Sequence, residues 1–123
     1  MRKLLAPTWI LLCAVVALGC TGNKRQDTLR ASIITLDATR DGFFEWDLQH
    51  QTAIVEKAAT KDEAHKAIDD YRRQKEVVLK LIVLAYRAVG FASTHDDEAS
   101  LQAAEAAAKK LFDGIVDIKK GAP

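Results

Sequence analysis

Apolar residues recur at intervals of three and four, or multiples of these, through the first half of the chain. The main members of this stripe are Leu29, Ile33, Leu36, Phe43 and Ile54. Such spacing places side chains along one face of an α-helix. The pattern therefore predicts a first long helix over residues 27–59. It continues through Gly42 at a cost of about 1 kcal/mol relative to alanine.

A second helix is predicted to begin at Thr60. Thr60 and Glu63 have the spacing of a capping box, in which a hydroxyl and a carboxylate satisfy backbone N–H groups at a helix start. Further along, residues 77–85 are apolar except for Lys80, and the stretch is shorter than the roughly 20 residues that span a membrane. Because a helix that is apolar all round must be covered all round, we expect this middle helix to be the most buried, enclosed by two neighbours.

A break at residues 93–94 separates a third predicted helix from the second. The acidic residues 96–98 follow this break and suit the positive end of a helix dipole. The apolar stripe of the third helix consists of Leu101, Ala104, Ala108, Leu111, Ile115 and Ile118. The basic pair at residues 119–120 and Gly121 fit its C-terminal end.

These elements predict an all-α fold, an antiparallel helical hairpin completed by a third helix into a three-helix bundle. With the turn near residue 60, positions of the first two helices whose numbers sum to about 120 lie opposite each other. The apolar pairs are then Leu29 with Phe91, Leu36 with Leu84, and Phe43 with Val77. Apolar side chains are therefore expected to meet along the whole hairpin.

The N-terminus has the layout of a leader for export. Arg2 and Lys3 precede an apolar stretch over residues 4–18, and small residues lie around Cys20. The segment Ala17-Leu18-Gly19-Cys20 resembles the lipobox of bacterial lipoproteins. This resemblance implies attachment of diacylglycerol to the Cys20 sulfur, cleavage before Cys20, and acylation of the new amino terminus with a fatty acid such as palmitate.

The resemblance divides the chain into a signal peptide at residues 1–19, a lipidated cysteine with a tether at residues 20–26, and a helical domain at residues 27–120. Two or more acyl chains make a stable membrane anchor. We therefore expect the domain to face the periplasm. Thr21 after the cysteine, in place of aspartate, favours the outer membrane, with the inner membrane as the alternative. An uncleaved transmembrane leader and ordinary secretion are the other interpretations of the same segment.

Charge and cysteine content narrow the possible partners. The 123 residues carry 18 Lys and Arg against 17 Asp and Glu, a net charge of +1, which does not favour a nucleic-acid partner. Cys13 belongs to the leader and Cys20 is the predicted lipid site, so the domain has no thiol left for a disulfide. Packing alone is expected to hold the helices together.

Three polar residues, Arg40, Asp47 and His50, lie among the apolar residues of the first helix's stripe. The hairpin pairing places Asp47 opposite residues 72–73 and His50 opposite Tyr71 and its acidic neighbours. Buried polar groups are normally paired, and such pairs help to fix register, which gives a structural explanation. The alternative is a ligand pocket between the helices, lined by Arg40, Asp47, His50 and Tyr71.

Metal binding is the sharper alternative for the histidines. Asp47 with His50, and Asp62 with His65, each place a carboxylate and an imidazole three residues apart. Paired elements of this kind bind two metals in some helical bundles, together with glutamates from the other helices. Those glutamates are not evident here, so we expect no metal and no other cofactor.

The remaining motifs favour a role in protein contacts. Neither a glycine-flanked nucleophilic serine nor a glycine-rich phosphate loop occurs, so we expect no enzyme. Phe43, Phe44 and Trp46 are too close in a helix to share one face, so at least one should face outward. One interpretation is that the third helix covers these rings or that they are singly exposed. The other is that Phe44 or Trp46 contributes to a patch for an envelope protein partner. The predicted function is a structural or protein-interaction lipoprotein. The alternatives are a small-molecule or metal-binding bundle and a phage-type lysis or exclusion lipoprotein.

Overall fold

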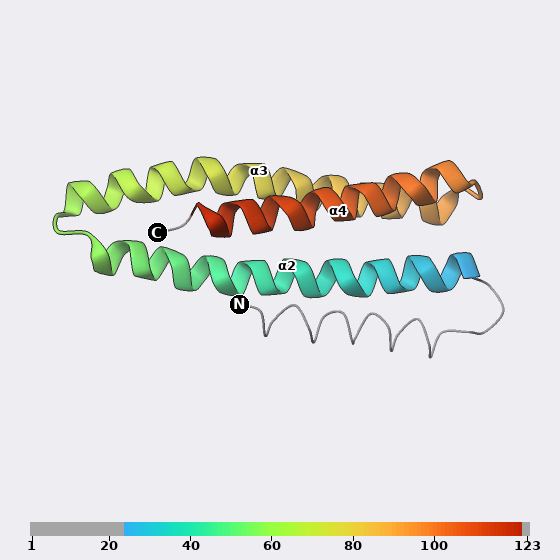
Figure 1. The fold of residues 1–123 in the computed structure, drawn as a ribbon, viewed down its shortest axis with the longest axis horizontal. Helices are drawn as coiled ribbons and strands as arrows, with labels where there is room; N and C mark the ends of the chain where they lie inside the picture. The colour runs from blue at the N-terminus through green and yellow to red at the C-terminus, as the bar shows by residue number, and fades with distance from the viewer. Residues whose placement is uncertain (1–23, 122–123) are drawn as a thin grey trace.

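The computed structural model describes residues 24–121 and contains three α-helices and no strand within that range. α2 spans Lys24–Lys57, α3 spans Lys61–Thr94, and α4 spans Glu98–Lys120. They run side by side, with α3 returning along α2 and α4 returning along α3 (Figure 1). The predicted hairpin completed by a third helix is confirmed. The signal peptide and the lipobox with Cys20 lie outside the described residues.

The helix starts follow the local sequence signals. Thr60 Oγ1 accepts a hydrogen bond of 3.2 Å from the Glu63 amide, and the Glu63 carboxylate accepts one of 3.1 Å from the Ala59 amide. The Asp97 side chain caps α4, accepting a bond of 2.6 Å from the Ser100 amide. At the other end of the domain, α2 begins at Lys24, before the expected start at residue 27, so the last residues of the predicted tether are helical.

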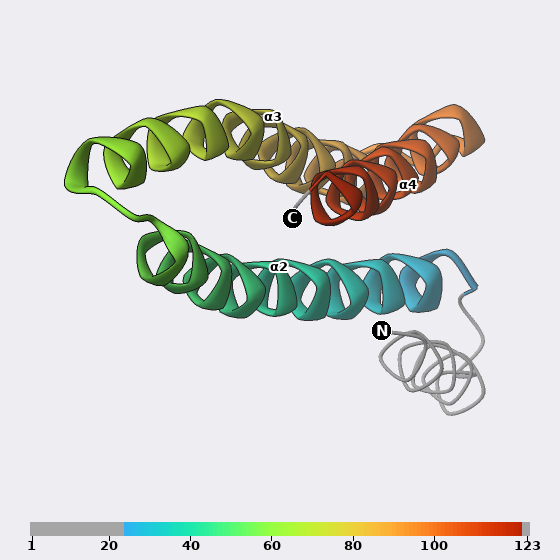
Figure 2. The same ribbon diagram turned by 60° about the vertical axis from the view of Figure 1, so that its left-hand side comes forward.

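The core lies where the three helices meet, and α4 packs more extensively on α3 than on α2. Its most deeply buried large side chains are Leu36 and Phe43 from α2, Val78 from α3 and Leu111 from α4. Because α4 is shorter than the other two helices, it ends before the α2–α3 turn (Figure 1). The tip of the hairpin therefore projects beyond the third helix, as the turned view also shows (Figure 2).

The prediction that Val77, Leu84 and Phe91 of α3 face the apolar residues of α2 is wrong. Val77 is 59% exposed, and Leu84 and Phe91 are each 53% exposed. The α3 residues that enter the core are instead the next ones along the chain, Val78, Ala85 and Ala92. A sum of residue numbers fixes the height along a hairpin, but one residue turns an α-helix by about 100°, so the height does not fix the face.

The expected all-round burial of α3 is also wrong, since Leu79 and Val83 on another side of the helix are exposed as well. Two neighbouring helices cover only the sides of α3 that face them. Within the described residues α3 is the one helix long and apolar enough to cross a membrane. Its most apolar 18-residue window has a mean hydropathy of 1.6, and 28% of that window is buried.

Candidate functional site

A buried carboxylate, Asp47, is the centre of the polar seam between α2 and α3. Asp47 Oδ1 accepts hydrogen bonds from Tyr71 Oη at 2.6 Å and from Gln51 Nε2 at 2.9 Å. Its Oδ2 accepts one from Lys75 Nζ at 2.7 Å, which is also an ion pair. Donors from both helices therefore converge on one side chain that is only 6% exposed.

The partners from α3 differ from the predicted ones. Residues 72–73 were expected opposite Asp47, but both are exposed, and the contacts come from Tyr71 and Lys75. These two residues are four apart and so share one face of the helix. The predicted pairing of the seam was right in height and missed by a rotation of α3.

The seam holds its groups in fixed protonation states. Burial alone would raise the pKa of Asp47, but the hydrogen bonds from Lys75, Tyr71 and Gln51 outweigh it and keep that pKa below its usual range. Burial, and then the hydrogen bond to Asp47, raise the pKa of Tyr71. At neutral pH the seam therefore holds a carboxylate anion, in an ion pair with Lys75, and a neutral phenol.

An aromatic stack extends the seam on the side of α4. The Trp46 and His50 rings are nearly parallel with their centres 4.7 Å apart, and the Tyr71 and His50 rings pack in a T-shaped arrangement with their centres also 4.7 Å apart. Lys119, at the end of α4, places its Nζ 5.6 Å from the centre of the Trp46 ring. Burial lowers the pKa of His50, which Asp47 opposes and Lys57 reinforces, so the imidazole is neutral at pH 7.

A hollow of about 240 Å³ lies beside this stack, between the two helices near the hairpin turn. It is lined by His50, Ala53, Ile54, Lys57, Ala58, Glu63 and Ala67. Of the residues predicted to line an interhelical pocket, His50 therefore does so. Asp47 and Tyr71 are bonded to each other in the seam and are not among the lining residues.

Arg40 lies in a second polar cluster, separate from the seam. Its Nε donates to Asp41 at 3.1 Å, and its guanidinium lies 5.6 Å from the centre of the Tyr86 ring. The Tyr86 hydroxyl donates to Asp37, and burial together with this hydrogen bond raises the pKa of Tyr86 to about 12. The structure thus divides the predicted group of Arg40, Asp47, His50 and Tyr71 into two clusters.

The two aromatic candidates for a partner patch have different environments. Trp46 is half-buried in the stack with His50. Phe44 lies on the part of the hairpin that faces away from α4, since helical spacing places it on the side of α2 opposite Trp46. Exposed apolar residues of this face are Phe44 (41% exposed), Leu48 (70%), Leu79 (36%) and Val83 (48%), here called the Phe44 surface.

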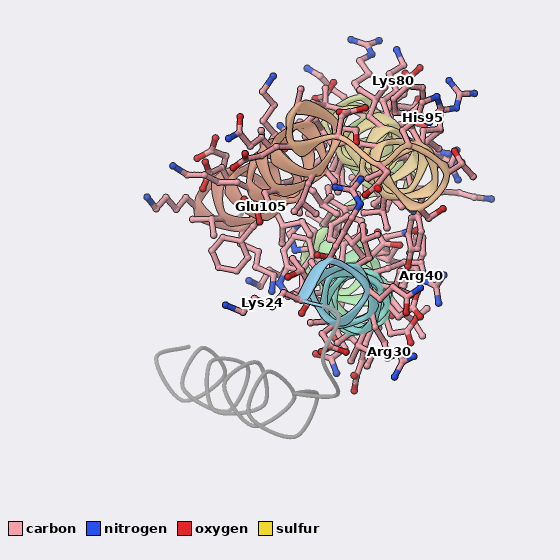
Figure 3. The ribbon with its side chains drawn as sticks, turned by 90° about the vertical axis from the view of Figure 1, so that its right-hand side faces the viewer. Lys24, Arg30, Arg40, Lys80, His95 and Glu105 are labelled. Carbon is pink, nitrogen blue, oxygen red and sulfur yellow. The ribbon has the colours of Figure 1, made fainter. Side chains whose placement is uncertain are left out.

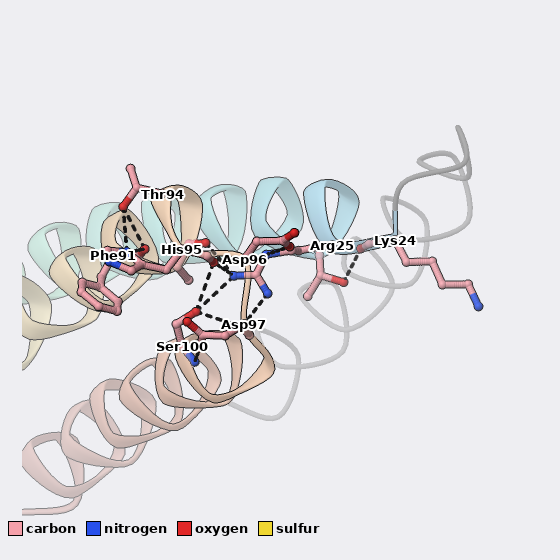
Figure 4. A network of polar contacts seen from close by, with 10 residues as sticks. Lys24, Arg25, Phe91, Thr94, His95, Asp96, Asp97 and Ser100 are labelled. Carbon is pink, nitrogen blue, oxygen red and sulfur yellow. Dashed lines mark hydrogen bonds and ion pairs between the residues drawn. The ribbon is translucent and has the colours of Figure 1, made fainter.

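Arg25 forms a third cluster, which the sequence patterns did not reveal (Figure 4). Its Nη1 donates to the Asp97 carbonyl oxygen at 2.8 Å, and its Nη2 donates to the Ala92 carbonyl oxygen at 2.8 Å and to Ser100 Oγ at 3.1 Å. Nη2 also donates to the carbonyl oxygen of His95. Because Arg25 lies far from these partners in the sequence, although close in space, no local spacing could have indicated the contact.

Neither metal ligands nor known relatives assign a function to these clusters. Among residues 24–121, His, Cys, Asp and Glu side chains do not gather in groups of three or more that could hold a metal ion. Compared with models of protein families, with curated proteins and with solved structures, the chain shows no significant match in any of the three. A function therefore has to be inferred from the residues of this chain.

Proposed function

We propose that the protein is a lipid-anchored helical protein of the bacterial envelope that acts by contact with another envelope protein and performs no catalysis. Cys20 carries the lipid in this proposal, and the helices face the periplasm from the outer membrane. The single observation that carries the contact role is the Phe44 surface. The resemblance of residues 17–20 to a lipobox supports the anchor.

The Phe44 surface differs from scattered apolar exposure because its members come from two helices at similar heights. The contacts of Asp47 with Lys75 and of Asp37 with Tyr86 bracket the level at which Phe44 and Leu79 lie. Single exposed apolar residues are common on soluble proteins, whereas contiguous patches mark interaction sites. Aromatic residues in particular are enriched in the buried parts of interfaces.

The geometry of this surface suits a helical partner. It lies along two antiparallel helices, on the side that α4 leaves open, which is where a fourth helix packs in a four-helix bundle. An amphipathic helix can place its apolar face on such a surface through residues three and four apart. We therefore propose that the partner contributes an amphipathic helix that lies along α2 and α3.

The polar seam supports a structural role and not catalysis. Every buried side-chain nitrogen and oxygen within residues 24–121 has a hydrogen-bond partner. Asp47 is engaged by three donors and Tyr71 by Asp47, so these groups are committed to each other. Satisfied buried networks of this kind fix the register of the elements that they join.

The anchor is tested by replacing Cys20 with alanine in the full-length chain. Cells given a clickable palmitate analogue are expected to label the unchanged protein and leave C20A unlabelled. C20A should also keep its leader and migrate as the larger precursor. Equal labelling of the two chains, or an unchanged protein found in the soluble fraction, would overturn the anchor.

The contact is tested by photocrosslinking in living cells. A benzophenone amino acid at position 44 is expected to give one discrete adduct, whose partner peptide mass spectrometry assigns to an amphipathic helix of an envelope protein. The same probe at Gly42, an exposed position that helical spacing places on the opposite side of α2 from Phe44, is the matched control. Leu79→Asp should abolish the adduct while leaving the helical circular dichroism unchanged. The contact role fails if position 44 gives no adduct or if L79D leaves it unaffected.

The hollow beside His50 supports a second candidate function, the binding of a small molecule. Its walls include Ala53 and Ile54, and its charged lining residues are Lys57 and Glu63, a combination suited to a mainly apolar molecule with a charged end. Native mass spectrometry of the purified protein should then show a bound mass that Ile54→Trp removes by filling the hollow. A protein of bare mass that also fails to bind a medium-chain fatty acid would exclude this candidate.

A further inference from the structure

A second apolar line runs along α3 with the spacing of a coiled coil. Its members, at alternating intervals of four and three residues, are Val77, Leu81, Leu84, Ala88 and Phe91. α4 covers only one edge of this line. Gly114 of α4 lies so close to Leu81 that a Cβ there would come within 2.6 Å of Leu81 Cδ1. The outer members Val77, Leu84 and Phe91 are more than half exposed.

The neighbouring part of α4 extends this line into a flat surface. Ala103 and Ala106 are exposed and, by helical spacing, lie on the side of α4 that adjoins the outer side of α3. Their short side chains let another helix approach closely. We call the five residues Val77, Leu84, Phe91, Ala103 and Ala106 the Leu84 surface. Lys80, at its edge, points away from α2, so this surface is distinct from the Phe44 surface (Figure 3).

Charges of opposite sign border the two sides of the Leu84 surface. Lys80 and Arg87 follow the α3 side, where Lys80 also pairs with Glu76 of the same helix at 3.4 Å, whereas Asp113 and Asp117 follow the α4 side. Because Leu81 meets Gly114, Lys80 lies at the height between the two aspartates. Lys110 also lies on the α4 side, at the height of Leu84 and Ala85. At the level of Lys80, toward the Val77 end, the surface therefore has a basic border and an acidic border at the same height.

We propose that the Leu84 surface binds the same surface of a second copy of this chain, around a two-fold axis that runs parallel to the helices. Rotation about such an axis places the basic border of one copy against the acidic border of the other. Lys80 then faces the partner's Asp113 and the partner's Asp117. A two-fold axis across the helices would instead bring the two basic borders together, which like charges oppose.

In the resulting dimer the α3–α4 pairs of the two copies pack face to face as a four-helix bundle with apolar residues inside. The line from Val77 to Phe91 supplies about 20 Å of contact at 1.5 Å per residue. The parallel arrangement places the starts of both α2 helices at one end of the dimer, as two lipid anchors in one membrane require. That last argument for the orientation rests on the proposed function, whereas the contact itself does not.

Disulfide crosslinking of the full-length protein in native membranes tests the contact and its direction. A residue near a two-fold axis meets its own counterpart, so Leu84→Cys is expected to form a covalent dimer on mild oxidation. Val77→Cys and Phe91→Cys should each do the same when expressed alone. An antiparallel dimer would instead crosslink V77C only with co-expressed F91C. Leu48→Cys, an exposed apolar position on the other face, is the matched control and should stay monomeric.

Sedimentation equilibrium of the full-length protein in detergent tests the contact without a covalent bond. The unchanged chain is expected to give a dimer, and Leu84→Asp should raise the dissociation constant at least tenfold. Lys80→Asp changes an exposed side chain and leaves the core intact. It should weaken the dimer because it reverses the charge at the basic border. Adding Asp113→Lys and Asp117→Lys to K80D should restore it. Leu48→Asp is again the control.

Several outcomes would overturn the dimer. They are a monomeric mass for the unchanged chain, oxidation that crosslinks L48C as fully as L84C, and protection of L84C from oxidation by membrane lipid. Exclusive crosslinking of V77C to F91C would overturn the parallel direction. The C20A protein separates this proposal from the lipid anchor, because its dimer should persist when the label is absent. Likewise, a dimer that forms without any adduct at Phe44 would contradict the proposed function alone.

Discussion

Arg25 Nη2 donates a hydrogen bond of 2.8 Å to the carbonyl oxygen of Ala92, which fastens the first turn of α2 to the end of α3. Carbonyl groups in the last turn of a helix lack partners within that helix, and the negative end of the helix dipole favours a cation. The same guanidinium bonds to the Asp97 carbonyl at the start of α4. One side chain of α2 therefore connects all three helices at the N-terminal end of α2.

Replacing Arg25 with alanine should lower the free energy of unfolding by about 1–3 kcal/mol, because the part-buried Ala92 carbonyl and Ser100 hydroxyl lose a charged donor. Thermal unfolding of the full-length protein, followed by circular dichroism at 222 nm, measures this. Arg30→Ala removes the same kind of side chain from an exposed position of the same helix and should leave the midpoint nearly unchanged. Equal midpoints for the R25A and R30A proteins would show that the cluster does not hold the helices together.

The seam makes a second prediction through Tyr71. Tyr71→Phe keeps the ring but removes a donor from a buried carboxylate, so it should cost about 1.5–3 kcal/mol of stability. Tyr71→Phe combined with Asp47→Asn should cost less than the sum of the single changes, because the two groups act on each other. Urea denaturation of the single and double variants measures the coupling. Additive losses would contradict a direct interaction.

The sequence indicated the elements of this fold well because their ends depend on local chemistry. Thr60 and Asp97 cap helices through side chains that reach only three residues along the chain. The rotation of α3 was not predictable in the same way. Its apolar residues surround the helix, so the pattern of residues 77–85 carries no information about which side meets α2. Packing with α4 decides that Val78, and not Val77, enters the core.

The candidate sites were also predictable only in part, because the sequence indicates height along the hairpin but not the side of a helix that packing covers. Pairing by height brought His50 to Tyr71, and the two rings do meet. Crowding of three aromatic residues required one to face outward, but the sequence could not choose between Phe44 and Trp46. The choice depends on Lys119 and on the stack with His50, which only the packed helices bring to Trp46.

Glycine substitutions test the helix packing directly. Gly42 has no atom within 4 Å of the place a Cβ would take, so Gly42→Ala should stabilise the protein by about 1 kcal/mol through helix propensity. At Gly114 the new methyl group would come within 2.6 Å of Leu81 Cδ1, so Leu81 must change its conformation. Gly114→Ala should therefore give little or none of that gain. Thermal midpoints that rise equally in both variants would contradict the close packing of α3 and α4.

The lowered pKa of His50 makes stability depend on pH in a defined direction. The unfolded chain binds a proton near the ordinary histidine value of 6.5, whereas the folded chain resists protonation because His50 is partly buried beside Trp46. The unfolded state therefore holds more protons between the two pKa values, and stability falls as pH drops from 6.5 toward the folded pKa. Asp47 adds a second loss at lower pH, below its ordinary value of 3.8, because its folded pKa is also depressed.

Urea denaturation of the full-length protein from pH 8 to pH 3 should therefore show two successive losses of stability, and His50→Gln should remove the first while keeping the second. Trp46 gives an independent signal of the first step, because a protonated imidazole stacked 4.7 Å away quenches indole fluorescence. The emission of the folded protein should fall with a midpoint at the pKa of His50 in the fold, which lies below 6.5. H50Q should abolish this change. A fluorescence midpoint at or above 6.5 would mean that the fold does not disfavour the charged ring.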